Sequence, residues 1–312
     1  MTTIGDVCLA ALADYKGCPW LWPRESDLVA HLVQEIKKEL GSSERIKAKA
    51  QYRSKTAGVP KAELTTTKVR TEAKLEDVPK PPQSRKTTSG ASTTTQTKAD
   101  EGNDKQRIDI CLLKESTTLH ILNAGIRDID LRVYPNEIDE ILEVKLAPHH
   151  YLKDDQTLWL SDLIKLWDIR SAYARPEQDD QFRLNAPMHL LSIDTGLPIE
   201  GLYQPPNVAP VLTMCQAENL KKCFPLVKGE RYQFTQAGRT VVLESIDPEA
   251  CSSSSSEIYF WALGVEAGTK LPEQPEQILD DKSLDAYVIP WSEYVAAEPA
   301  CWKVTEVTEV NT

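Results

Sequence analysis

The feature that most constrains the fold is a run of alternating segments between residues 106 and 147. In "RIDICLL", residues 107–113, the apolar side chains of Ile108, Ile110 and Leu112 recur at every second position. This period of two is typical of a β-strand with one buried face. Similar patterns occur in "TLHIL", "RDIDLRVY" and "EIDEILEVKLA", which cover 118–122, 127–134 and 137–147. We therefore expect four strands, with a turn at Pro135 between the last two.

Helical patterns stand on both sides of these strands. Residues 4–16 and 24–41 predict two amphipathic helices, the second opened by Pro23 and ended by Gly41. Residues 154–174 predict a third helix, and "APMHLLSIDTGLPI", 186–199, predicts a further strand. Helices and strands that follow one another in this order indicate an α/β fold.

Residues 44–105 differ in composition from the rest of the chain. Between 45 and 100 there are thirteen Lys and Arg against five Asp and Glu, with many Thr, Ser and Pro. Such a stretch buries little apolar surface, so we expect a basic, mostly disordered insertion. Whether "TTKVRTEAKL" forms one strand is left undecided by the sequence. The insertion could be a solvated linker or a flexible arm that follows phosphates. The resulting division is 1–43 (helices of the core), 44–105 (insertion), 106–205 (α/β core) and 206–312 (β-rich C-terminal extension).

Charge and cysteine content limit the function classes. The formal net charge of -11 argues against non-specific coating of nucleic acid by the whole surface. The seven cysteines show no zinc-type spacing, which favours reduced thiols. No run has the length of a membrane span, so we expect a cytoplasmic protein that does not enter membranes.

One strand carries charges where a core strand should not. In "EILEVKLAP", 140–148, Ile141, Glu143 and Lys145 share one face, and the other face is apolar. Asp109 stands opposite the apolar side of its own strand. If the two strands are neighbours, Asp109 and Glu143 could bind a divalent cation through two carboxylates, and Lys145 could assist an attacking water.

An Asp on one strand, Glu-x-Lys on a later strand, and then a helix and a strand resemble the PD-(D/E)XK nuclease superfamily over residues 20–200. The resemblance implies a restriction-endonuclease-like mixed sheet flanked by helices, and a Mg²⁺ or Mn²⁺ ion held by Asp109 and Glu143. It also implies a catalytic role for Lys145, and a further acid on the preceding helix, for which Glu25 is the best match.

The chain departs from the family pattern in several places. The residue before Asp109 is isoleucine rather than proline, and 34 residues separate Asp109 from Glu143. Asp128 or Asp130 could take the place of Asp109, and Glu35 could take the place of Glu25.

Other polar residues near the pattern have simpler interpretations. We expect His149 and His150 to be loop histidines, because adjacent residues point apart. Lys165 and Arg170 could touch phosphate, although charges on a helix surface usually do nothing specific.

The sequence thus predicts a metal-dependent nuclease that hydrolyses phosphodiester bonds, with DNA as the favoured substrate. The alternatives are a non-enzymatic interaction or scaffold protein and a decayed nuclease fold that binds without cutting. The C-terminal extension could hold a protein partner or a second copy of the chain.

Overall fold

The structure of the protein is a computed structural model. It covers residues 3–17, 21–22, 24–53, 61–75, 107–115, 117–123, 129–146, 158–174, 179–193, 211–215, 226–236, 238–251, 256–266, 276–279, 285–290 and 297–307. The first residues of the predicted helix at 154–174 and the histidines 149 and 150 lie outside these residues.

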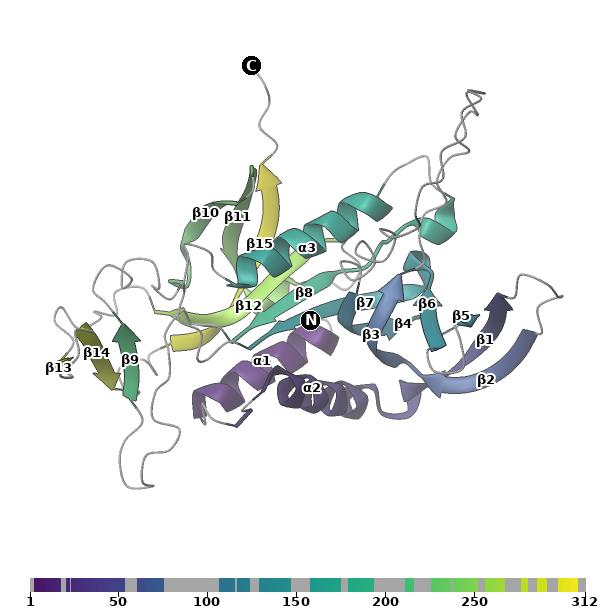
Figure 1. Ribbon diagram of the computed structural model, residues 1–312, viewed down its shortest axis with the longest axis horizontal. Coiled ribbons are helices and arrows are strands. Elements are labelled where there is room, and N and C mark those ends of the chain that lie inside the picture. Colours follow the sequence, from purple (N-terminus) through teal and green to yellow (C-terminus); the bar gives the residue numbers. More distant parts are fainter. Residues whose placement is uncertain are drawn as a thin grey trace, which may run out of the picture.

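One mixed, twelve-stranded sheet dominates the fold (Figure 1). Its order is β10 (Arg231–Gln236), β11 (Arg239–Ile246), β15 (Ala297–Val307), β12 (Ile258–Val265), β8 (Met188–Ser192), β7 (Ile138–Lys145), β4 (Arg107–Leu113), β3 (Val69–Leu75), β6 (Ile129–Val133), β5 (Thr118–Asn123), β1 (Arg45–Arg53) and β2 (Lys61–Thr67). The pairs β7–β8, β8–β12, β3–β6 and β1–β5 are parallel. A second, three-stranded sheet consists of β13 (Glu276–Leu279), β14 (Asp285–Pro290) and β9 (Val211–Cys215).

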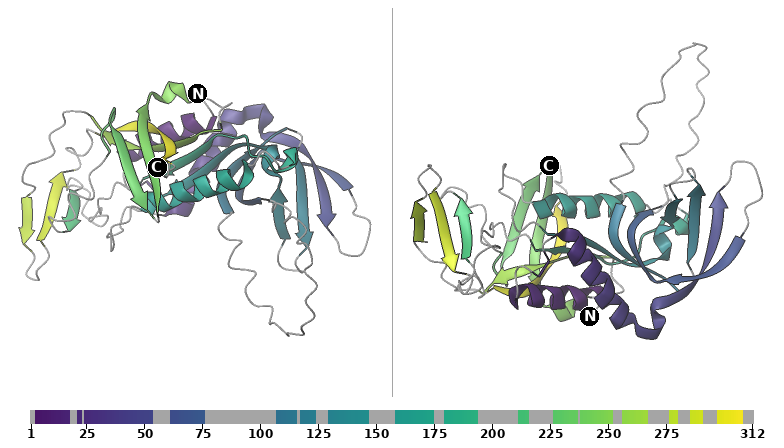
Figure 2. Two further views of the ribbon diagram at one scale, coloured as in Figure 1. Left: turned by 90° about the horizontal axis from the view of Figure 1, so that it is seen from above. Right: turned by 60° about the horizontal axis from the view of Figure 1, so that its bottom comes forward.

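In the described part of the chain three α-helices flank the large sheet, which confirms the mixed α/β class. Figures 1 and 2 show α1 (Thr3–Gly17) and α2 (Glu25–Leu40) on one face and α3 (Leu158–Tyr173) on the other. Short 3-10 turns are η1 (Gly41–Glu44), η3 (Pro135–Glu137), η4 (Asp180–Phe182) and η5 (Pro248–Ala250). No helix among the described residues combines the length and the apolar character that crossing a membrane requires.

The second helix shows how the sequence sets a C-terminal end, whereas Pro23, predicted to open this helix, lies outside the described residues. Leu28, Leu32 and Ile36 are fully buried and lie at helical spacing. Gly41 adopts φ 51°, and its backbone N–H donates to the carbonyls of Lys37 and Lys38. A glycine pays no Cβ penalty in this left-handed conformation, so the predicted stop at Gly41 is confirmed.

The basic stretch is more ordered than its composition predicts. Residues 45–53, 61–67 and 69–75 form β1, β2 and β3 of the large sheet, whereas a mostly disordered insertion with at most one strand was expected. Every second residue there is apolar or small, and Ile46, Ala73 and Leu75 are buried. Pairing with distant strands supplies the burial that the segment lacks by itself. Residues 76–106 lie outside the described part of the chain.

In the last third of the chain, β10, β11, β12 and β15 join the large sheet, and β9, β13 and β14 form the separate second sheet. Strand β12 pairs in parallel with β8, and β15 and β11 continue the sheet from there. Phe260, Trp261 and Trp302 are fully or almost fully buried in this region. The large sheet is therefore built from both the predicted core and the predicted extension.

The surroundings of Gly264 show how tightly β12 packs against β15. A Cβ placed there would lie 3.0 Å from the Ala300 Cβ and from Trp302 Cη2, and 3.2 Å from the Leu226 carbonyl oxygen. We expect Gly264→Ala to lower the free energy of unfolding by about 1–3 kcal/mol, because the strand must shift to admit the methyl group. Gly17→Ala is the matched control, since a Cβ at Gly17 meets nothing within 4 Å. Equal melting temperatures for the two variants would contradict this description of the packing.

Candidate functional site

The candidate site lies where β4 and β7 part. The two strands pair antiparallel from Leu113 with Ile138, across a register shift, to Ile110 with Leu142, and β7 then continues alone on that side. On its other side β7 keeps its partner, because the Ile193 amide donates to the Lys145 carbonyl at 2.8 Å. One edge of β7 is therefore open at its carboxyl end.

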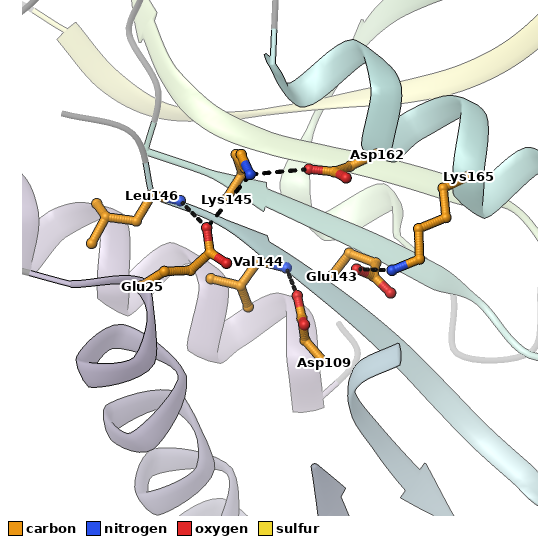
Figure 3. Close-up of polar contacts among 8 residues, drawn as sticks. All are labelled: Glu25, Asp109, Glu143, Val144, Lys145, Leu146, Asp162 and Lys165. Carbon is orange, nitrogen blue, oxygen red and sulfur yellow. Dashed lines mark hydrogen bonds and ion pairs between the residues drawn. The ribbon is translucent and has the colours of Figure 1, made fainter. Parts of the chain in front are cut away.

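Two carboxylates take the place of the missing strand. The Val144 amide donates to Oδ2 of Asp109 at 2.9 Å, and the Leu146 amide donates to Oε2 of Glu25 at 3.2 Å (Figure 3). Amides two residues apart in a strand face the same edge, so Asp109 and Glu25 lie side by side along it. Both residues were predicted at the site from the sequence, and the structure brings them to the same strand.

Glu143 and Lys145 lie on the face of β7 that α3 covers. The carboxylate of Glu143 accepts from Nζ of Lys165 at 2.8 Å. Nζ of Lys145 lies 3.7 Å from Oε2 of Glu25 and 3.9 Å from Oδ2 of Asp162. The shared face of Glu143 and Lys145 is thus confirmed, and Figure 3 shows both facing the helix.

Two members of the cluster, Asp162 and Lys165, come from α3, and the sequence pattern did not identify either as a site residue. Lys165 was expected to be a non-specific surface charge, and Asp162 was not singled out at all. The two residues stand three apart on the helix, a spacing that puts them on one side, next to the strand acids. The available signal was the pairing of an acid and a base on a helix directly after Glu-x-Lys.

The electrostatics of the cluster are unfavourable for its acids. Glu143 is 3% exposed, and burial raises the pKa of its carboxyl to about 8, with a further rise from the charge of Asp109 and an opposing effect of Lys165. Burial also raises the pKa of Asp162, against the influence of Lys145 and Lys165. Oε1 of Glu143 is buried and has no hydrogen-bond partner. Four acids thus face two lysines, and one acid oxygen is left unsatisfied.

The capacity of the site for a metal rests on few ligands. Among the described residues, no three of His, Cys, Asp and Glu form a group that could hold a metal ion. A magnesium ion needs only one or two protein carboxylates, since water and phosphate oxygens complete its shell. The unsatisfied Oε1 of Glu143, beside the charge of Asp109, fits such a ligand. The metal assignment to Asp109 and Glu143 stays a prediction.

The alternatives raised by the sequence separate clearly in the structure. Glu35 on α2 pairs with Lys38 on its own helix, whereas Glu25 reaches β7. Asp130 lies on β6, which β3 and β4 separate from β7. Asp128 lies outside the described residues.

The long spacing from Asp109 to Glu143 and the position of Arg170 on α3 are both explained by the structure. The long spacing from Asp109 to Glu143 contains the antiparallel pair β5–β6, which joins the sheet beyond β3 and leaves β4 next to β7. Arg170 stacks over the ring of Trp167, with 5.2 Å from its Cζ to the ring centroid.

Comparison of the chain with family models, curated proteins and solved structures finds no match. The assignment of the site therefore depends on the geometry of the residues themselves.

The raised pKa of Glu143 predicts a specific pH dependence of stability. The native state holds a proton that the unfolded state loses near pH 4.5, so this group makes the free energy of unfolding fall as pH rises from about 4.5 to about 8. We expect Glu143→Gln to match the wild type near pH 5 and to exceed its melting temperature increasingly toward pH 8.5. Thermal unfolding at several pH values measures this difference.

A matched control is Glu266→Gln, because Glu266 is half exposed in its ion pair with Lys228. This control should shift the melting temperature by a similar small amount at every pH. A gap between Glu143→Gln and wild type that stays constant from pH 5 to pH 8.5 would refute the buried, protonated carboxyl.

Proposed function

We propose that this chain is a metal-dependent nuclease with a restriction-endonuclease-like core, acting on phosphodiester bonds at the open edge of β7. The observation that carries the proposal is the meeting of Glu25 and Asp109 at this edge, next to Glu143 on the α3 face of β7, each from a different element. Lys145 completes the Glu-x-Lys pattern and lies within 4 Å of two of the acids of the cluster.

The residues have distinct parts in this proposal. Asp109 and Glu143 would hold Mg²⁺ or Mn²⁺, which supplies charge neutralisation and an activated water when bound. Lys145 is held between Glu25 and Asp162, so its ammonium stays at the edge where a water or a developing charge needs it. Glu25 fixes this position through the Leu146 amide and the Lys145 ion pair.

A second candidate function is a decayed nuclease fold that binds nucleic acid without cutting it. The observation in its favour is that the acids already have protein partners: Asp109 and Glu25 accept backbone amides, and Glu143 accepts Lys165. In that case the cluster holds the open edge of β7 together, and a non-enzymatic scaffold would use the same contacts. Cation binding and cleavage separate these possibilities.

Cation binding should show in stability. We expect Mg²⁺ or Mn²⁺ at ten to one hundred times the dissociation constant to raise the free energy of unfolding of the wild type by about 1–3 kcal/mol. Glu143→Gln and Asp109→Asn should lose this gain, because each removes one of two carboxylate ligands. Thermal unfolding with and without the cation, in buffer matched for ionic strength, measures the effect. Asp139→Asn, on the same strand but paired with Lys68, should keep the gain, and equal gains in all variants would count against the site.

Cleavage tests the enzyme directly. We expect wild-type protein with Mg²⁺ or Mn²⁺ to cleave plasmid DNA or a single strand, and Lys145→Met and Asp109→Asn each to lower the rate by at least about 100-fold. Lys228→Met, a half-exposed lysine in a pair with Glu266, is the control that should retain the wild-type rate. Activity untouched by both site substitutions rules out the mechanism. A stable cation complex without cleavage selects the decayed fold.

A further inference from the structure

Six strands at one end of the large sheet share an uneven distribution of charge. We call β4, β3, β6, β5, β1 and β2, in that order across the sheet, the wing. Its strands contain nine Lys and Arg and four Asp and Glu. The strand register places all thirteen on one face, and the opposite face holds no charged position. In a chain of net charge -11, this face carries a surplus of five positive charges.

A row of polar positions crosses the charged face of the wing from strand to strand. Each neighbouring pair in this row is a register pair of the sheet: Arg107 with Lys74, Lys74 with Arg132, Arg132 with His120, His120 with Gln51, and Gln51 with Lys61. Strands lie about 4.8 Å apart, so the row extends over roughly 24 Å. Four of its six members are Lys or Arg, and a fifth is a histidine.

The charged face leads into the candidate site. Arg107 stands two residues before Asp109 on β4, hence on the same face. The pair of Cys111 with Ile141 joins this face to the side of β7 that carries Glu143 and Lys145. Helix α3 packs on β7, β8 and β12, and Figure 1 shows the wing continuing beyond it.

Exposure agrees with this division of the wing into two faces. Arg45 and Lys47 are exposed, and the side chain of Arg107 is 45% exposed in an ion pair with Glu72. On the opposite face Ala73 and Val133 are buried. Among the wing residues whose exposure is described, Arg45, Lys47 and Arg107 thus reach solvent from the charged face, whereas Arg70 is half-buried and Cys111 and Leu113, next to β7, are buried.

We propose that the charged face of the wing binds the sugar-phosphate backbone of nucleic acid and leads it to the open edge of β7. A row of about 24 Å matches roughly seven base pairs, since each strand of a duplex carries one phosphate per 3.4 Å. Apart from His120, no position of this face on the described strands is aromatic, so the contacts read phosphates and not bases. The identity of the polyanion rests on the proposed nuclease function, whereas binding is measured without cleavage.

Binding in EDTA tests the wing independently of catalysis. The probes are fluorescent 20-base-pair duplexes and 20-nucleotide single strands of two unrelated sequences, followed by anisotropy between 50 and 200 mM salt. We expect Arg45→Glu with Lys47→Glu to weaken binding at least about tenfold and to reduce the slope of log K against log salt by about 1.4 to 1.8. Both unrelated sequences should bind alike.

The matched control is Lys38→Glu with Lys228→Glu, which changes the net charge equally at exposed sites outside the wing. Control binding within about twofold of wild type supports the wing, and equal loss in both double variants overturns it. Binding of anionic phosphatidylserine vesicles or polyglutamate as tightly as nucleic acid also overturns it, because the face then selects charge or a lipid surface alone. Wing-dependent binding without any cleavage leaves this inference standing while the nuclease proposal fails.

Discussion

The hydrogen bonds from the Val144 and Leu146 amides to Asp109 and Glu25 determine the shape of the site. A β-strand edge inside a protein must satisfy its amides, and normally a neighbouring strand does so. Here the pairing of β4 with β7 ends at Ile110 and Leu142, and two side-chain carboxylates accept the next amides of β7 instead. Hydrogen bonds to charged groups contribute about 1.5–3 kcal/mol each, so they can hold an edge open where a backbone ladder would close it.

Everything else in the cluster follows from that opening. Glu25 holds Lys145 at the edge, and Lys145 in turn lies near Asp162 of α3. Glu143 shares the same face but is almost fully buried, and its carboxyl depends on Lys165 for its only hydrogen bond from a described residue. A buried acid with one unsatisfied oxygen lowers the stability of the fold. A cation bound to that oxygen would offset this cost.

The sequence was sufficient for the parts of the structure that depend on local pattern. Alternation predicted β4, β7 and the shared face of Glu143 and Lys145, the apolar segment 186–199 predicted β8, and Gly41 predicted the C-terminal end of α2. It failed for β1 and β2, whose low hydrophobicity is typical of disordered segments, because the pairing of β1 with the distant β5, which places both strands in the sheet, cannot be read from local pattern. It also missed Asp162, because the meeting of α3 with β7 is a tertiary contact that no local spacing encodes.

The charged face of the wing has a surplus of Lys and Arg, whereas the cluster at β7 has more acids than lysines. This difference in charge limits the functions that the two surfaces can share. Even with Glu143 protonated, the three remaining acids Glu25, Asp109 and Asp162 outnumber the two lysines of the cluster and disfavour a phosphodiester at the edge of β7, whereas the charged face of the wing would attract one. A nucleic-acid backbone held by the wing would therefore stop short of Glu143 unless a divalent cation or a proton neutralises the cluster. Because Arg107 and Asp109 stand two residues apart on β4, the change of sign occurs within about 7 Å. In the proposed function, attraction over the wing and a cation requirement at its end would together confine cleavage to the metal-loaded protein, while binding of the backbone would need no metal.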